Sequence, residues 1–427
     1  MVFFVSNSCS PPLRYTVSKM THIDPRFPRP PKKMRVPLYP NAGRILGFCT
    51  PRSFDRFLAA FADLLHAKRD QIICADSASN ALYVQLANYK SRSKKDTVKI
   101  ALPAYNCTSV IDAVVSAGCE PVLVDVGTDT HPTKKAIDYM ITQNCDMFLW
   151  PNFFGTRRRD EQQLSKLKKA GIHIVFDEAQ SFPFSYDTIA SQVEEYAYAV
   201  LISFGRSKPL AGCGGGALYV VSDSVASTNA VKATWGRALK ENVQYCLEAS
   251  VQAARWRFPR LAGAIFPVKK RLYRALDVQQ AHTTAVQYKA HAPMKMLHAQ
   301  IALKNLASLK ARAAHHAADY AVFTQALRER SASFAMFLDH IEGFPAIAAL
   351  SVDPDRRHLI MEWFTSRGIQ VRWYYLPLHM IQRYSSCMQQ PHLRADAISA
   401  RVLIVPFSWS HTAKQKQAVL AAIRLLS

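Results

Sequence analysis

A lysine between two predicted strands is the residue of this sequence with the greatest potential for chemistry. Lys208 follows the apolar residues 199–202, and a glycine-rich turn after it leads to a second apolar run at 217–221. Short apolar runs bounded by glycine and serine predict buried strands. A loop lysine is usually solvated, so Lys208 becomes a candidate only if other reactive groups are expected beside it.

An acid and several hydroxyls are predicted at comparable positions. Asp177 directly follows the apolar residues 172–176, where a carboxylate is costly unless it faces a cation or a hydrogen-bond donor. Ser77 and Ser79 stand where a helix is expected to begin, and a helix N-terminus with hydroxyls suits a phosphate. Ser203 adds a hydroxyl at the end of the strand that precedes the lysine.

The elements that must position these groups alternate between strand and helix. Strands are predicted at residues 72–75, 98–102, 121–126, 146–150 and 172–176, and helices at 54–65, 81–87, 109–117 and 160–170. This alternation is typical of an α/β fold with a mostly parallel sheet between helices. Ligands bind such sheets at the carboxyl ends of the strands. Amine, acid, phosphate cradle and glycine-rich loop are therefore expected on one edge, and pyridoxal phosphate requires those parts.

Two motifs in this order carry a family resemblance. Asp177 opens Asp-x-x-Gln, and Lys208 closes Ser-Phe-x-x-x-Lys. With the segments around them, the chain resembles the DegT/DnrJ/StrS-type sugar aminotransferases, which are fold type I pyridoxal-phosphate enzymes. The resembling segments are residues 102–126 (LPAYNCTSVIDAVVSAGCEPVLVDV), 153–180, 203–221 (SFGRSKPLAGCGGGALYVV), 368–379 (GIQVRWYYLPLH) and 401–415. The resemblance covers most of residues 70–225 and, more loosely, 290–427.

The resemblance implies a role for each candidate. Lys208 would form the Schiff base with the cofactor and later move the proton between Cα and C4′. Asp177 would keep the ring nitrogen protonated, and Gln180 would bond the 3-oxygen of the ring or line the ring. The residues implied in binding the phosphate are Ser203, Ala78 and Ser79.

Each of these residues also has a purely structural interpretation. Ser79 could be only a helix cap, and Ser203 only a hydroxyl at a strand end. Gln180 could be a solvated loop residue. Without a cofactor, Asp177 would cap a helix or a turn.

The sequence departs from the family pattern at three positions. Where many members stack an aromatic ring on the cofactor, this chain has Cys107, with Tyr105 two positions earlier. Either Tyr105 takes that role or the ring packs on the Cys107 thiol. Asn152 replaces a common histidine and is a candidate substrate contact, and the loop at 77–80 lacks the usual glycine.

A histidine in the C-terminal part is a further candidate for substrate contact. His379 matches a family position near the mouth of the active site. A lone histidine is more often structural, so both interpretations stay open.

Composition limits the architecture and the partners. We expect a proline-rich basic arm at 1–50, a large cofactor-binding domain at 51–325 and a small α+β domain at 326–427. Residues 1–5 are apolar but too short for a signal peptide, and Met20 is an alternative start. The net charge of +23 favours anionic partners, and no nucleic-acid-binding motif is present.

A basic insertion is expected at about 235–292. Cations and aromatic residues interleave at 255–260 and 269–274. This segment is either a solvated helical insertion or a patch for an anionic membrane or a phosphate-rich substrate. Nine scattered cysteines without a Cys-x-x-Cys pair predict neither disulfides nor a metal site, and favour the reducing cytoplasm.

The family resemblance implies an aminotransferase. Glutamate would donate the amino group to a nucleotide-linked keto-sugar, in the synthesis of cell-envelope polysaccharide or secondary metabolites. Relatives that dehydrate sugars replace the lysine by histidine, so Lys208 argues against that reaction. A membrane-associated binding protein with weak turnover is a second alternative. The family also implies a homodimer with active sites at the subunit interface.

Overall fold

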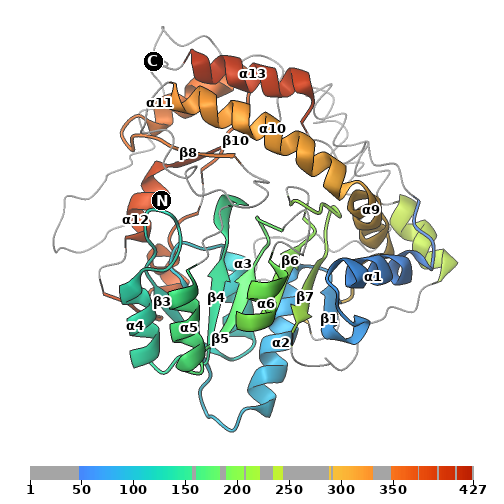
Figure 1. The fold of residues 1–427 in the computed structure, drawn as a ribbon, viewed down its shortest axis with the longest axis vertical. Coiled ribbons are helices and arrows are strands. Elements are labelled where there is room, and N and C mark those ends of the chain that lie inside the picture. The colour runs from blue at the N-terminus through green and yellow to red at the C-terminus, as the bar shows by residue number, and fades with distance from the viewer. Residues whose placement is uncertain are drawn as a thin grey trace.

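An eight-stranded sheet lies at the centre of the protein (Figure 1). The computed structural model describes residues 48–155, 160–182, 189–205, 208–221, 234–243, 288–289, 292–329, 348–373, 375–391, 394–408 and 411–425. In spatial order, the strands are β1 (Ile72–Ala75), β7 (Gly216–Val220), β6 (Ala197–Ser203), β5 (His173–Asp177), β4 (Met147–Pro151), β2 (Lys99–Pro103), β3 (Glu120–Val124) and β9 (Met388–Gln389).

The directions of the strands bring the predicted site residues to one edge of the sheet. All pairs from β6 to β9 are parallel, whereas β7 is antiparallel to both β6 and β1. β1 therefore runs in the same direction as β6, and both end at the edge where β7 begins. The mostly parallel sheet predicted from the sequence is confirmed.

The strands bury both of their faces, as their continuous apolar runs predict. Along β4, Met147 and Leu149 pack on one side of the sheet, whereas Phe148 and Trp150 pack on the other. The first side is covered by α2 (Ala78–Arg92) and α3 (Thr108–Ser116). The second is covered by α1 (Ser53–Leu64), α4 (Lys134–Thr142), α5 (Glu161–Lys169), α6 (Ala190–Tyr196) and α9 (Met296–Ala307).

The helices begin where polar side chains can cap them. Ser77 accepts a hydrogen bond from the backbone N–H of Asn80 at the start of α2, and Asp160 accepts one from Gln163 at the start of α5. Such caps satisfy N–H groups that have no partner inside the helix. The helix predicted at 81–87 is longer in the structure: this cap starts it three residues earlier, and it continues to Arg92.

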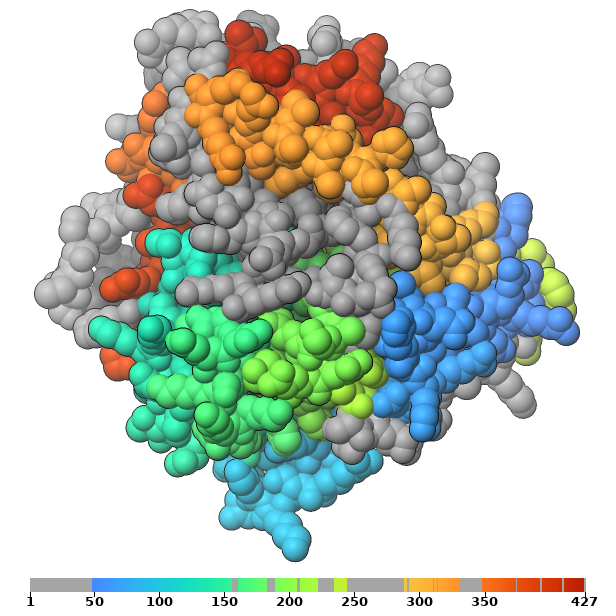
Figure 2. All heavy atoms as spheres, viewed as in Figure 1, coloured from blue at the N-terminus to red at the C-terminus, as the bar shows by residue number. Residues whose placement is uncertain are grey.

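A second, smaller sheet pairs β8 (Ala348–Ser351) with β10 (Val402–Val405) in antiparallel register. Its core is shared with α10 (Leu309–Arg328), α11 (Arg357–Ser366) and α13 (Ala413–Arg424), while α12 (Ala395–Arg401) leads into β10. Figure 2 shows α10 and α13 along one end of the molecule and α1 beside α9.

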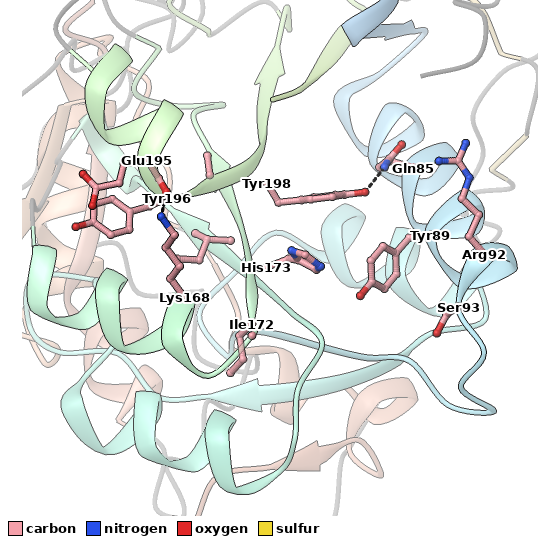
Figure 3. A pocket seen from close by; sticks show the side chains of 13 residues that line it. Gln85, Tyr89, Arg92, Ser93, Lys168, Ile172, His173, Glu195, Tyr196 and Tyr198 are labelled. Atoms are coloured by element: carbon pink, nitrogen blue, oxygen red, sulfur yellow. Dashed lines mark hydrogen bonds between the residues drawn. The ribbon is translucent and has the colours of Figure 1, made fainter. Parts of the chain in front are cut away.

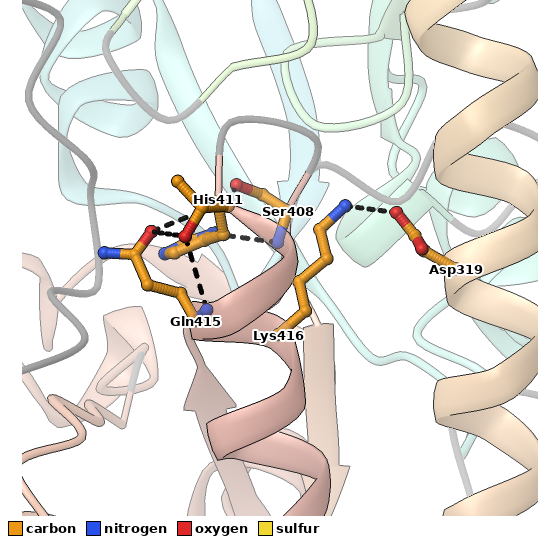
Figure 4. A network of polar contacts seen from close by, with 6 residues as sticks. Asp319, Ser408, His411, Gln415 and Lys416 are labelled. Carbon is orange, nitrogen blue, oxygen red and sulfur yellow. Dashed lines mark hydrogen bonds and ion pairs between the residues drawn. The ribbon is translucent and has the colours of Figure 1, made fainter.

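Polar contacts fix α13 against α10 (Figure 4). Lys416 on α13 forms an ion pair with Asp319 on α10. In the turn before α13, the Ser408 backbone N–H donates to His411 Nδ1 at 3.1 Å. Thr412 and Gln415 form a reciprocal capping box at the start of the helix.

Several expectations fall where the structure gives no description. The arm predicted at 1–50 lies outside the described residues except for 48–50, as do the basic clusters at 255–260 and 269–274. The domain boundary at 325/326 stays a prediction. β9 follows that boundary in the sequence but belongs to the large sheet. No helix among the described residues is long and apolar enough to span a membrane.

Candidate active site

A cavity of about 250 Å³ opens where the parallel strands end. Its walls come from the beginnings of α2 and α3, from the ends of β4, β5 and β6, and from the loop that carries the candidate lysine. The predicted site residues that line it are Lys208, Asp177, Gln180, Ser203, Ala78, Ser79, Cys107 and Asn152. Tyr105 and His379 are not among the lining residues.

Lys208 and Asp177 form the reactive pair of this cavity. Burial raises the pKa of the Asp177 carboxyl to about 6, although the Ala179 N–H, which donates at 3.0 Å, and the positive charge of Lys208 act in the opposite direction. Burial also lowers the pKa of the Lys208 amine, and the Asp177 carboxylate opposes that shift. Both groups are therefore displaced toward their neutral forms. The neutral amine is a nucleophile, and a cation bound beside Asp177 would return the carboxyl to its ionised form.

The start of α2 forms the polar end of the cavity. The Ser79 hydroxyl lies 3.4 Å from the Ser77 hydroxyl, which is itself 3.2 Å from the Asn80 backbone N–H. The first N–H groups of a helix lack intrahelical partners and carry the positive end of its dipole. This end of the cavity can therefore bind a phosphate.

The glycine missing from residues 77–80 has a counterpart in the strand beneath. A Cβ atom on Gly216, the first residue of β7, would lie 2.2 Å from the backbone nitrogen of Ala78. Only glycine allows the strand to approach α2 so closely. The contact is therefore made without a glycine at position 78.

Ser203 lies at the end of β6, on the wall of the same cavity. Its hydroxyl accepts a hydrogen bond from the Gly205 N–H at 3.4 Å. This contact orients the hydroxyl at the start of the loop that leads to Lys208. A phosphate role for Ser203 stays a prediction.

Gln180 connects two remote segments at the cavity wall. Its Oε1 accepts from the Phe154 backbone N–H at 2.9 Å, and its Nε2 donates to the Tyr375 hydroxyl at 2.9 Å. Phe154 has a φ of 57°, a left-handed conformation that is strained for a non-glycine residue. Gln180 therefore holds this turn. Tyr375 also lines the cavity, although no sequence pattern indicated it.

Only one of the two stacking candidates reaches the cavity. Cys107 lines it, with its Sγ atom 3.2 Å from the Ser109 hydroxyl. Tyr105 is fully buried behind it, with ring centroids 5.4 Å from Phe153 and 5.7 Å from Tyr375. The geometry therefore favours the thiol, rather than the Tyr105 ring, beside a bound cofactor.

The two candidate substrate contacts differ in their surroundings. Asn152 lines the cavity, and its Nδ2 atom donates to the Glu178 carboxylate at 2.8 Å. His379 instead lies with its Nε2 atom 3.0 Å from the Asp396 carboxyl group. This pairing supports the structural interpretation of His379, while both substrate roles stay predictions.

A larger cavity, of about 620 Å³, opens at the opposite edge of the sheet (Figure 3). It lies among the end of α2 and the beginnings of β5 and β6. Lys168 donates there to the Glu195 carbonyl oxygen at 2.8 Å and lies over the Tyr196 ring, 5.6 Å from its centroid. None of the predicted site residues lines this cavity.

The fold and the site together define a pyridoxal-phosphate enzyme of fold type I. The chain belongs to the DegT/DnrJ/EryC1/StrS aminotransferase family, whose sequence profile matches residues 48–424. The protein is accordingly a pyridoxal-phosphate-dependent aminotransferase. No curated protein matches the chain.

Solved structures share the fold at low sequence identity. A family aminotransferase from Brucella abortus is 16% identical with a TM-score of 0.62, covering 88% of this chain and 91% of that one. PseC from Helicobacter pylori, an aminotransferase of pseudoaminic acid biosynthesis, is 14% identical with a TM-score of 0.62, covering 92% and 98%. The ntda protein from Bacillus subtilis, solved with bound cofactor PMP, is 17% identical with a TM-score of 0.62, covering 93% and 86%.

The residues of the cavity fit this cofactor. A buried acid, an amine displaced toward its neutral form and a helix N-terminus surround one cavity. They match the pyridine nitrogen, the aldehyde and the phosphate of pyridoxal phosphate. Among the described residues, no group of three or more His, Cys, Asp or Glu could hold a metal ion.

Proposed function

We propose that this aminotransferase moves an amino group from glutamate to a keto-sugar carried on a nucleotide. The family and the Helicobacter pylori neighbour, which acts in pseudoaminic acid biosynthesis, support a sugar acceptor. The net charge of +23 supports a phosphate-rich one, because a positive field attracts anions. The product would serve cell-envelope polysaccharide or secondary-metabolite synthesis in the cytoplasm.

The single observation that carries this proposal is the pairing of Lys208 with Asp177 in one cavity. The Asp177 carboxylate would accept a hydrogen bond from the protonated ring nitrogen and stabilise its charge. Backbone N–H groups of Ala78 and Ser79, with the hydroxyls of Ser79 and Ser203, would bind the phosphate.

Pyridoxal phosphate supplies an aldehyde and an electron-withdrawing ring to this site. The Lys208 amine would be the nucleophile for that aldehyde, because burial favours its neutral form. With the donor amino acid bound, the same amine would take the proton from the donor Cα and deliver it at C4′. A lysine suits both tasks, which favours amino transfer over the sugar dehydration of histidine-bearing relatives.

A direct test uses purified protein loaded with pyridoxal phosphate. Glutamate should convert its visible absorbance to that of the amine form, and a panel of nucleotide keto-sugars should restore it. Mass spectrometry of the mixture should then show an aminated nucleotide sugar. If glutamate leaves the spectrum unchanged, the donor assignment fails, and if no keto-sugar restores it, the acceptor assignment fails.

The family also supports a homodimer with residues of both subunits at each site. Size-exclusion chromatography with light scattering checks the subunit number. A mixture of the Lys208→Ala and Asp177→Ala variants would then test whether the Lys208 and Asp177 of each active site come from the same chain. If they do, mixing the variants restores no activity.

A further inference from the structure

The helix of residues 235–243 is fixed to the protein by one face. Ala238 packs in an apolar cluster with Cys49 and α9. The Glu241 carboxylate accepts from the Leu297 backbone N–H at 3.0 Å, and the Asn242 side chain exchanges two hydrogen bonds with the Cys49 backbone, at 2.9 and 3.2 Å. The inner face is therefore well anchored beside α1 and α9 (Figure 1).

The outer face of this helix carries exposed apolar side chains. Trp235 is 72% exposed, Leu239 is 65% exposed and Val243 is 43% exposed. Residues four apart lie on one side of a helix, so these three form a single stripe. Phe48, also 72% exposed, precedes the Cys49 that Asn242 holds, and so lies next to this helix. Large apolar side chains gathered in this way mark an interaction surface.

The charges of the helix are positive on its exposed side. Lys240 is exposed beside the stripe, and so is Arg237, whose Nε atom forms an ion pair at 3.3 Å with Glu241. Glu241, the only acid among residues 235–243, is buried and also accepts from Leu297. The sequence that follows adds cations at 255–260 and 269–274. An aromatic and aliphatic stripe flanked by cations is typical of a helix that lies in a membrane interface.

We propose that the stripe of Phe48, Trp235, Leu239 and Val243 docks this enzyme on an anionic lipid membrane. The apolar side chains would enter the boundary of the acyl chains, and Lys240 would lie among the lipid phosphates. A second copy of the chain fits this surface less well, because a two-fold contact would oppose the same cations. None of the stripe residues lines either cavity.

The test is cosedimentation with vesicles of phosphatidylcholine alone or mixed with phosphatidylglycerol. The cofactor-loaded full chain should bind only the mixed vesicles, and more weakly as salt increases. The double variant Trp235→Ser/Leu239→Ser should lower the partition coefficient by about tenfold or more, because two apolar anchors are lost. Val322→Ser is the matched control, because Val322 is an exposed residue of α10 (47%) and its loss should change nothing.

Three results would overturn the proposal. The full chain could fail to bind the mixed vesicles at low salt. The double variant could bind them as tightly as the unmodified protein. It could also change the subunit number while vesicle binding stays the same, which would assign the stripe to a second copy. Retained aminotransferase activity and thermal midpoint show that the double variant is folded.

Discussion

The two cavities at opposite edges of the sheet show that the larger cavity of a protein need not be its active site. The cavity at the amino ends of β5 and β6 is the larger, at about 620 Å³ against about 250 Å³. Its Lys168 is bound to a backbone carbonyl and lies over a tyrosine ring. In the smaller cavity, Lys208 and Asp177 have pKa values displaced by burial. Such displaced groups in a cleft mark a functional site.

Helix α2 runs from one cavity to the other, with its N-terminus at the smaller cavity and its C-terminus at the larger one. Its first residues, Ala78 and Ser79, line the smaller cavity, whereas Arg92 at its end lines the larger one. The N-terminus of a helix attracts anions and the C-terminus does not. The same helix therefore provides a phosphate site at only one edge, and variants at the two edges should have unequal effects.

The largest difference is expected between the two lysines. Lys208→Ala should lower kcat for amino transfer by about 10³-fold or more, because the nucleophile and proton carrier are both lost. Lys168→Ala, in the larger cavity, should leave kcat unchanged. Steady-state assays of both variants measure this, and equal losses would show that the smaller cavity is not the active site.

The acid of the smaller cavity should come next. Asp177→Asn should lower kcat by about 10²-fold, because an amide cannot stabilise the charge of a protonated ring nitrogen. Glu195→Gln at the larger cavity is the control and should have normal activity. The absorbance spectrum of Asp177→Asn with bound cofactor should report the altered ring protonation, and an unaltered spectrum would contradict this role.

The approach of β7 to α2 predicts a loss in cofactor affinity. In Gly216→Ala, the new methyl group would meet the Ala78 backbone at 2.2 Å and displace the start of α2. The dissociation constant for pyridoxal phosphate should rise by about tenfold or more, a change of about 1.4 kcal/mol. Gly236→Ala is the control, because a Cβ atom there meets nothing within 4 Å. Equal affinities in a fluorescence titration would refute this explanation.

The pKa of Asp177 gives the smaller cavity a pH dependence. Burial raises it from 3.8 to about 6, so the folded protein without cofactor binds this proton more tightly than the unfolded chain. The contribution of Asp177 to the free energy of unfolding therefore decreases as pH rises between those values.

Cofactor affinity should change in the opposite direction, because the ring nitrogen needs the ionised carboxylate. The affinity for pyridoxal phosphate should therefore increase as pH rises through about 6. Titrations from about pH 5 to about pH 8 should show this increase. The increase should be absent in Asp177→Asn, and a persistent one would assign it to another group.

The smallest effect is expected within the larger cavity. Gln85→Leu removes the hydrogen bond that Gln85 Nε2 donates to the Tyr198 hydroxyl at 2.6 Å. The free energy of unfolding should fall by about 1 kcal/mol, with unchanged kcat. Denaturant titration and a standard assay check both, and a large loss of kcat would mean that the two edges are coupled through α2.

The parts of the site that depend on local sequence pattern could be predicted from the sequence. Apolar runs followed at once by Asp177 or Ser203 predicted strand ends, and parallel strands bring such ends together. Tyr375 could not be assigned in this way, because it meets Gln180 across 195 positions of the chain. Neither could the contact of Gly216 with Ala78, which depends on how closely one strand lies beneath a helix.

The choice between Cys107 and Tyr105 shows a similar limit. The two residues lie in one short loop, and periodicity does not decide which side chain turns toward a cavity. The aromatic cluster with Phe153 and Tyr375 holds Tyr105 in the core. β9 was also beyond prediction, because a strand of two residues is too short to produce a pattern.

β9 has a consequence for how the protein is made. Met388 and Gln389 pair with Val122 and Leu123 of β3, and the Gln390 backbone N–H donates to the Leu123 carbonyl oxygen at 2.8 Å. During synthesis, the edge of β3 stays uncovered until residues 388–390 have left the ribosome. An open strand edge invites pairing with other chains, so slow translation of the segment between β3 and β9 should increase aggregation of the nascent protein.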